Sequence, residues 1–180
     1  MKNKENVRIL AESGILVAVA VALDYVFGLF SPFRYGGSIS PAMVPIFMIA
    51  VRRGWKPGIA AGLAFGILQS ILNMYFLSIV QYALDYLVAF AVLGFAGCVK
   101  GAAEKPGRLA LAFALGSFFR YLAHGFSGVW FWGMYAPEGV DVWFYSFVLY
   151  NLPYMAASAA FSIAVGWIMQ KRGLFRPDRA

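Results

Sequence analysis

Long apolar runs separated by short polar connections make up almost the whole chain. A helix needs about 20 apolar residues to cross the hydrocarbon layer of a membrane, and runs of this length recur along the sequence. The clearest of them are residues 9–30, 57–77, 78–99, 109–132 and a last run that ends at Met169. This pattern predicts a series of membrane-crossing helices.

A further apolar run is shorter than the others. Residues 40–51 hold only twelve residues before Arg52, fewer than the roughly 18 expected of a membrane-crossing helix. This helix must therefore begin earlier, near Gly36, or cross the membrane incompletely. Taken together, the runs predict an all-α integral membrane protein, a six-transmembrane-helix bundle in which residues 1–180 form a single transmembrane domain.

The composition agrees with a membrane protein. Apolar residues make up 62% of the chain and charged residues only 13%, which leaves too little polar surface for a water-soluble helical protein of this size. The first apolar run is not a signal peptide, because it is too long, contains Asp24 and is followed by no small-residue cleavage site.

Basic residues collect in alternate connections between the runs. They are Lys2, Lys4 and Arg8, then Arg52, Arg53 and Lys56, then Lys100, Lys105 and Arg108, and finally Lys171, Arg172, Arg176 and Arg179. The opposite connections hold only Arg34, Glu138 and Asp141 as charged residues. Because basic loops remain in the cytoplasm, both termini are predicted to be cytoplasmic. The same rule accounts for the net charge of +7 without a nucleic-acid partner.

Charged and titratable residues deep in the apolar runs need a reason to be there, because burying them in a membrane is costly. At the rise of a helix, Asp85 lies about 22 Å from Lys100, and Arg120 and His124 lie about 18 and 24 Å from Arg108. The three side chains therefore reach a similar level in the outer half of the membrane. One interpretation is a buried ion pair between Asp85 and Arg120 that sets the register of two helices.

Aromatic and amide side chains favour a binding site instead. Those that reach the same outer level are Tyr75, Gln81, Tyr82, Tyr86, Trp130, Trp132, Tyr145 and Asn151. Such a group suits a flat, heteroaromatic and cationic solute. Taken singly, Trp130, Trp143 and Tyr135 are typical of the aromatic belt at a membrane interface. Glu12 and Asp24 are interpreted as structural, with Glu12 reaching the inner interface beside Arg8 and Asp24 reaching water at the outer end.

Enzyme signatures are absent from the sequence. It has no phosphate-binding loop, no H-E-x-x-H motif, no Cys/His metal cluster and only one cysteine, Cys98, so we expect no ATP hydrolysis, metal or cofactor. In the first run, Gly14, Ala18 and Ala22 lie four residues apart, which allows another helix to approach closely. Spacing alone favours packing within the monomer.

Several segments resemble one membrane-protein family in order and spacing. They are YGGSIS at 35–40, DYLVAF at 85–90, RYLAHGFSG at 120–128, Trp132, VWFYS at 142–146 and Asn151. The family is the thiamine-specific S-component, the substrate-binding membrane subunit of energy-coupling factor (ECF) transporters. The resemblance implies a prokaryotic cell-membrane protein that binds thiamine near the outside. It also implies a transmembrane coupling protein and two ATPase subunits as partners.

The resemblance also implies roles for individual residues. By position, the ligand contacts are Asp85, His124, Trp132, Asn151, Tyr75, Tyr145, Arg120 and Tyr86, and the contacts with the coupling protein are Gly14 and Ala18. Thiamine has a cationic thiazolium and a hydrogen-bonding aminopyrimidine, which an aromatic face, a carboxylate and a carboxamide would bind. Arg120 is expected to keep the Asp85 carboxylate ionised when the pocket is empty.

This chain departs from the family at four places. Gly36 and Ser40 stand where some relatives have a tryptophan and a glutamate, and Asp85 is one methylene shorter than the glutamate of some members. Tyr145 stands six residues before Asn151 where five are expected. Two other functions remain as alternatives. One is an S-component for another flat vitamin such as riboflavin. The other is an independent secondary transporter with a proton relay of Asp85, Arg120 and His124, against which the lack of inverted repeats argues.

Overall fold

A computed structural model describes residues 2–32, 37–72 and 75–176 of the chain. The residues named above that fall outside this description, in whole or for their side chain, include Lys2 (side chain only), Arg34, Gly36, Arg179 and Tyr35 of the YGGSIS segment. The described residues contain helices and turns but no strand, which confirms the predicted all-α class.

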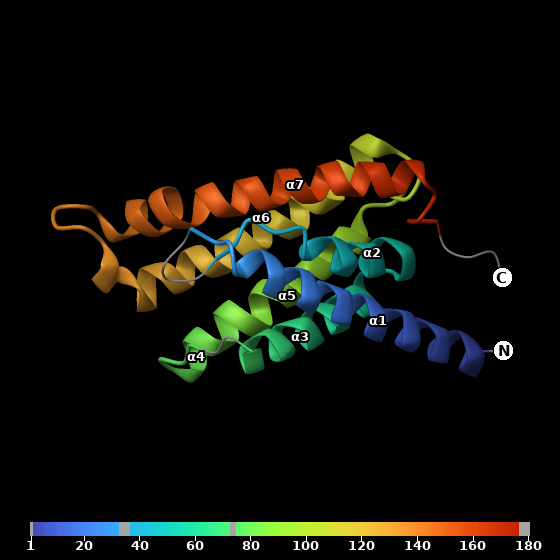
Figure 1. Cartoon of the computed structure of the whole chain (residues 1–180), viewed down its shortest axis with the longest axis horizontal. Coiled ribbons are helices and arrows are strands. Elements are labelled where there is room, and N and C mark those ends of the chain that lie inside the picture. Colours follow the sequence, from blue (N-terminus) through green and yellow to red (C-terminus); the bar gives the residue numbers. More distant parts are fainter. Residues whose placement is uncertain (1, 33–36, 73–74, 177–180) are drawn as a thin grey trace.

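Six helical rods build the bundle (Figure 1). The first three are α1 (Lys2–Gly28), α2 (Met43–Arg53) and α3 (Trp55–Leu72). The fourth is continuous through α4 (Ile79–Tyr82), η1 (Ala83–Val88), α5 (Ala89–Ala91) and η2 (Val92–Cys98). The fifth is α6 (Pro106–Phe131), followed by a short turn, η3 (Gly133–Tyr135), and the sixth joins η4 (Phe144–Asn151) to α7 (Leu152–Lys171).

Four of the rods are long and apolar enough to cross a membrane. They are Asn3–Gly28, Ile79–Cys98, Pro106–Phe131 and Phe144–Lys171. Many of their large apolar side chains are exposed, as for Leu111 and Ile168. A membrane supplies apolar surroundings for these side chains, which water would not.

The short α2 helix forms the centre of the core. All of its residues from Met43 to Ala50 are buried, and the Phe47 ring stacks on Phe113 of α6 with 4.3 Å between ring centres. With 11 residues, α2 is about 16 Å long, too short to cross a membrane. Residues 37–42 before it are not helical, so of the two predicted possibilities, incomplete crossing is the one found in the described residues.

One predicted boundary is wrong. The third run was expected to remain helical to Leu77, but α3 ends at Leu72 and residues 75–78 are not helical. The Ser78 hydroxyl accepts a 3.1 Å hydrogen bond from the Gln81 amide and so caps the next helix. Serine is a favoured N-cap because its oxygen satisfies an amide that has no partner within the helix. The helix break lies between two apolar segments, where hydrophobicity gives no signal.

The start of α1 and the end of α7 lie at the same end of the bundle (Figure 1). At this end Glu12 of α1 forms ion pairs with Arg52 and Arg53 of α2, with a 2.7 Å separation from Arg52 Nε. Gln170 also donates a 2.8 Å hydrogen bond to the Ala102 carbonyl, which ties the connection after η2 to α7. The basic connections therefore gather at one end, and the cytoplasmic location of that end stays a prediction. The sequence analysis expected Glu12 to lie beside Arg8 at the inner membrane interface. Its ion pairs with Arg52 and Arg53 instead join α1 to α2.

Candidate functional site

A cavity of about 630 Å³ lies among the helices near the end of α1, the end of α6 and the start of α7. Its volume falls within the range of small-molecule binding sites. Every residue that the sequence analysis assigned to the ligand lies on its wall: Tyr75, Asp85, Tyr86, Arg120, His124, Trp132, Tyr145 and Asn151. Residues from η1, α6 and η4 and from the connections beside them are thus brought together around one space, as expected from their common level.

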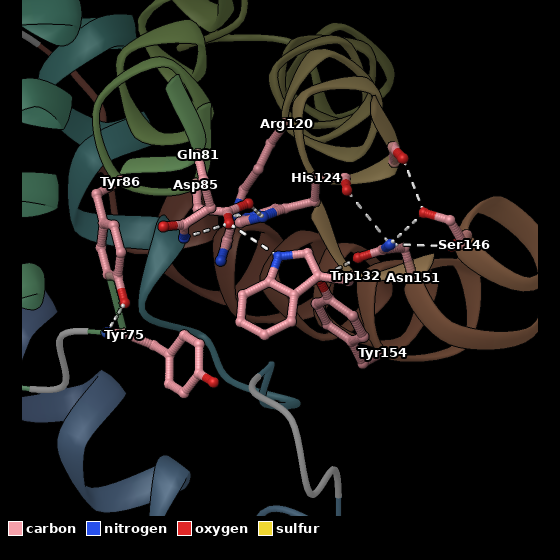
Figure 2. Close-up of polar contacts among 11 residues, drawn as sticks. Tyr75, Gln81, Asp85, Tyr86, Arg120, His124, Trp132, Ser146, Asn151 and Tyr154 are labelled. Carbon is pink, nitrogen blue, oxygen red and sulfur yellow. Dashed lines mark hydrogen bonds and ion pairs between the residues drawn. The ribbon is translucent and has the colours of Figure 1, made fainter. Parts of the chain in front are cut away.

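Asp85 is the centre of the polar contacts in this cavity. Its Oδ2 atom accepts hydrogen bonds from Gln81 Nε2 at 2.8 Å and from Trp132 Nε1 at 3.3 Å. Its Oδ1 atom lies 3.2 Å from His124 Nδ1. Figure 2 shows these side chains converging on the carboxylate from α4, from α6 and from the residue just beyond α6. An ionised carboxylate is an acceptor only, so this arrangement stabilises its charged form.

The expected direct ion pair between Asp85 and Arg120 is not found among the described residues. His124 lies between them, and Arg120 Nε donates to His124 Nε2 at 3.4 Å. Arginine can only donate, so Nε2 must accept and the histidine proton must be on Nδ1, where it points to Asp85. The histidine is therefore neutral, and it connects the arginine to the carboxylate. The position of a residue along its helix shows how deep it lies in the bundle, but it does not show which residues of the same depth are in contact.

Arg120 has an aromatic partner as well. Its guanidinium carbon lies 4.5 Å from the centre of the Phe90 ring. This cation–π contact helps to hold the charge in a largely buried position. Arg120 therefore orients His124 from one side while packing on Phe90 of α5 from the other.

Two π-helical segments form part of the cavity wall. Asp85 and Tyr86 lie in η1, and Tyr145, Ser146 and Asn151 lie in η4. Such wide turns are rare and occur frequently at functional sites, because they rotate side chains away from the regular helical positions. The segment η4 also explains the unexpected spacing of Tyr145. A π turn accommodates one residue more than an α turn, and Tyr145 and Asn151 face the same cavity.

Asn151 is held by protein groups on both sides of its carboxamide. Its Nδ2 atom donates to the Ser146 carbonyl at 2.9 Å, and its Oδ1 atom accepts from the Tyr154 hydroxyl at 2.6 Å. Ser146 in turn donates a 2.7 Å hydrogen bond to the carbonyl of Gly125. Gly128 lies against this group, and a Cβ atom there would collide with the Ser146 hydroxyl. The network fixes the orientation of the amide at the cavity wall.

Aromatic rings form another side of the cavity. The Trp132 ring lies 5.0 Å from Tyr75 and 6.0 Å from Tyr135, centre to centre, and it is stacked on the latter. The Tyr86 hydroxyl accepts a 3.0 Å hydrogen bond from the Tyr75 amide. Tyr135 was expected in the interfacial belt and instead lines the cavity. The belt interpretation suits Trp130 and Trp143, which are exposed on the outside.

Asp24 and Gln69 are among the polar residues of the wall that the sequence analysis missed. Asp24, expected to reach water, lines the cavity, on the inward stripe of α1 that contains Val17 and Ala20. Gln69 of α3 is only 9% exposed and also lines the cavity, and its side-chain oxygen has no hydrogen-bond partner among the described residues. The spacing of Asp24 from Val17 and Ala20 is a helical signal that could have placed it inward.

Ser40 is buried away from the cavity. Its hydroxyl accepts a 3.1 Å hydrogen bond from the Ala42 amide, and its own amide donates to Ser158 of α7 at 3.2 Å. Where some relatives have a glutamate, this serine therefore organises the start of α2. A search of the described residues finds no group of three His, Cys, Asp or Glu side chains that could hold a metal ion.

The small-residue face of α1 lies outside the bundle. Gly14 and Ala18 are both exposed, and a Cβ atom added to Gly14 would meet nothing within 4 Å. The interpretation that this face packs within the monomer is therefore wrong for the described structure. The inward face of α1 is instead formed by residues such as Val17 and Ala20.

The fold and the cavity define a class of protein: a multi-helix membrane protein with a partly enclosed, aromatic and acidic pocket for a small molecule near one end of its bundle. Comparison with known proteins agrees. A family model described as "Thiamine transporter protein" matches residues 10–174. The chain belongs to this thiamine transporter protein family.

Individual relatives cover most of the chain. Thiamine transporter ThiT of Bacillus subtilis is 42% identical over 168 residues, which cover 87% of this chain and 86% of the relative. Thiamine transporter ThiT of Lacticaseibacillus paracasei is 34% identical over 167 residues, covering 83% and 80%. The solved structure of ThiT from Listeria monocytogenes matches with a TM-score of 0.77 and 29% identity, over 96% of this chain and 100% of that chain. The bacterial relatives and the long apolar helices identify a multi-pass protein of the cell membrane.

Proposed function

We propose that this chain binds thiamine in the cavity around Asp85 and acts as the substrate-binding S-component of an energy-coupling factor transporter. The observation that best supports this proposal is the Asp85 carboxylate. It is fixed by hydrogen bonds from Gln81 and Trp132 and lies next to an aromatic wall. The names of the relatives point to the same vitamin.

The chemistry of thiamine matches the two kinds of surface in this cavity. The thiazolium ring carries a permanent positive charge, which the faces of Trp132 and Tyr75 attract. The aminopyrimidine presents an amine and ring nitrogens, which suit the Asp85 carboxylate and the Asn151 carboxamide. The neutral form of His124 leaves the negative charge of Asp85 available to the ligand.

Transport driven by ATP requires partners, because this chain has no phosphate-binding loop of its own. The proposed partners are a transmembrane coupling protein and two ATPase subunits. The exposed face of α1 at Gly14 and Ala18 supports such docking, since it offers a second helix a close approach inside the membrane. ATP hydrolysis by the partners would then drive the release of thiamine to the cytoplasm.

A binding panel tests the ligand. Purified protein in detergent should bind one thiamine per chain in calorimetry, and binding should quench tryptophan fluorescence because Trp132 lies on the cavity wall. Riboflavin and other vitamins serve as comparison ligands. Saturation with another vitamin and no heat with thiamine would reject thiamine as the substrate.

An uptake measurement tests the need for partners. Cells that express the chain without the coupling protein and the ATPases should bind thiamine but not accumulate it. Accumulation by the chain alone would favour an independent transporter. The Asp85–His124–Arg120 contacts are a poor proton relay, because Arg120 remains protonated at one end.

A further inference from the structure

Asp24 places a second carboxylate in the cavity. It lies on α1, seven residues after Val17 and four after Ala20, both of which are buried. This spacing continues the inward stripe of the helix. Its side chain lines the same cavity as Ser38 and Arg120. Asp24 of α1 and Arg120 of α6 therefore place opposite charges on two helices that border one cavity.

The described charges of the cavity wall can be added up. The charged or titratable acidic and basic side chains that line it are Asp24, Asp85, Arg120 and His124. The histidine is neutral, because its Nε2 atom accepts from Arg120. With both carboxylates ionised, one positive charge faces two negative charges, and the sum is one negative charge. Without Asp24 the sum would be zero.

We propose that Asp24 sets the charge selectivity of the cavity. By compensating Arg120, it leaves the Asp85 carboxylate uncompensated, so the cavity prefers a cationic ligand over a neutral ligand of the same shape. Asp24 is thus a specificity-determining residue, and contact between its carboxylate and the ligand is not required. This inference rests on the proposed function for the identity of the cation.

The physical basis is the weak screening of charges in a largely apolar site. Coulomb interactions persist over several ångströms where the effective dielectric constant is low. A cationic ligand feels the sum of all charges around the cavity, whereas a neutral ligand of the same shape feels mainly local contacts. A purely structural role for Asp24 would change the affinity for both ligands alike.

The test compares two ligands on purified protein. The first is thiamine, and the second is a neutral analogue in which a thiophene ring replaces the thiazolium. In Asp24→Asn, the ratio of thiamine affinity to analogue affinity should fall about tenfold or more, with the analogue affinity changed by less than about threefold. Glu138→Gln is the matched control, because it also removes one negative charge but from the exposed loop before η4. It should leave the ratio unchanged.

A double variant separates charge from local damage. Asp24→Asn combined with Arg120→Gln removes one negative and one positive charge and restores the sum, and the new amide can still donate to His124. The affinity ratio should therefore return toward that of the wild type. An unchanged ratio in Asp24→Asn, or no recovery in the double variant, would overturn the inference even though the wild type binds thiamine. If the wild type fails to bind thiamine, the proposed function fails, and this inference fails with it.

Discussion

At the scale of single residues, the hydrogen bonds show that the polar groups of the cavity have different roles. The Asp85 carboxylate accepts hydrogen bonds from Gln81 and Trp132 and lies beside His124. Arg120 instead donates its hydrogen bond to the histidine. The carboxylate is thus held in place by neutral partners. A charge that is fixed but not cancelled by its direct neighbours is well suited to attract a cation.

Replacing Asp85 by Asn removes this charge with little change of shape. We expect thiamine affinity to fall by about 1.5 to 3 kcal/mol, roughly ten- to a hundredfold, which is the contribution of a hydrogen bond to a charged group. Calorimetry gives the affinity, and thermal unfolding without ligand gives the stability.

The stability measurement distinguishes a ligand contact from a structural role. An unfolding temperature near that of the wild type together with weak binding supports the contact. A large loss of stability with affinity preserved in the folded fraction would show that Asp85 serves the fold. The Glu138→Gln variant, changed in an exposed loop, controls for the loss of a negative charge.

Gln69 gives a second prediction at this scale. Its side-chain oxygen is buried without a partner among the described residues, and such a group costs about 1 to 3 kcal/mol. Replacing Gln69 by Met keeps the volume and removes the polar atoms, so the ligand-free protein should unfold at a higher temperature. A lower unfolding temperature would show that the amide is satisfied in the ligand-free protein. Thiamine affinity, measured in parallel, tells whether the amide also serves the ligand.

At the scale of elements, the π-helical segments and the outward face of α1 matter most. The segments η1 and η4 bring Asp85, Tyr145 and Asn151 to the cavity from positions that regular α-helices would rotate differently. In α1, the inward face holds Asp24 and the outward face holds Gly14 and Ala18. One helix therefore contributes both to the cavity and to the proposed docking surface.

Bulky substitutions on the outward face of α1 test the docking surface. Gly14→Trp and Ala18→Trp should each abolish thiamine uptake by the assembled transporter but leave thiamine binding nearly unchanged, because a close helix contact tolerates no added bulk. Leu111→Trp, on an exposed position of α6, is the control and should preserve both activities. Equal loss of binding and uptake in the α1 variants would show that the substitutions damage the monomer.

At the scale of the whole molecule, the bundle has a basic end and a cavity end. Both the start of α1 and the end of α7 lie at the basic end, while the turn between α6 and α7 lies at the other (Figure 1). The distribution of basic residues predicts that the basic end faces the cytoplasm. The cavity then lies toward the outside, where the substrate arrives.

Cysteine labelling tests this orientation. Cys98, the only cysteine of the chain, is exposed at the end of η2 near the basic end. A membrane-impermeant maleimide should label it only after the cells are permeabilised. Glu138→Cys, made in a Cys98→Ser background, should react in intact cells. Labelling in the reverse pattern would place the termini outside and would contradict the predicted topology.

The sequence by itself determined the class of the protein, the helices and the common level of the cavity residues. Apolar length determines whether a helix suits a membrane, and the constant helical rise determines how deep each residue lies. This is why Asp85, Arg120 and His124 could be placed at one level before any contact was known. The S-component resemblance rested on local segments such as residues 120–128, which can be recognised from the sequence without a structure.

Only the tertiary structure decided how each helix is turned about its own axis and which neighbours meet. A helix surrounded by lipid is apolar on most sides, so its pattern of hydrophobic residues does not reveal the inward face. For this reason Asp24 was expected in water, the spacing of Gly14 taken alone favoured packing within the monomer, and one interpretation paired Arg120 directly with Asp85. Packing of the bundle placed Asp24 in the cavity, left Gly14 exposed and inserted His124 between Arg120 and Asp85.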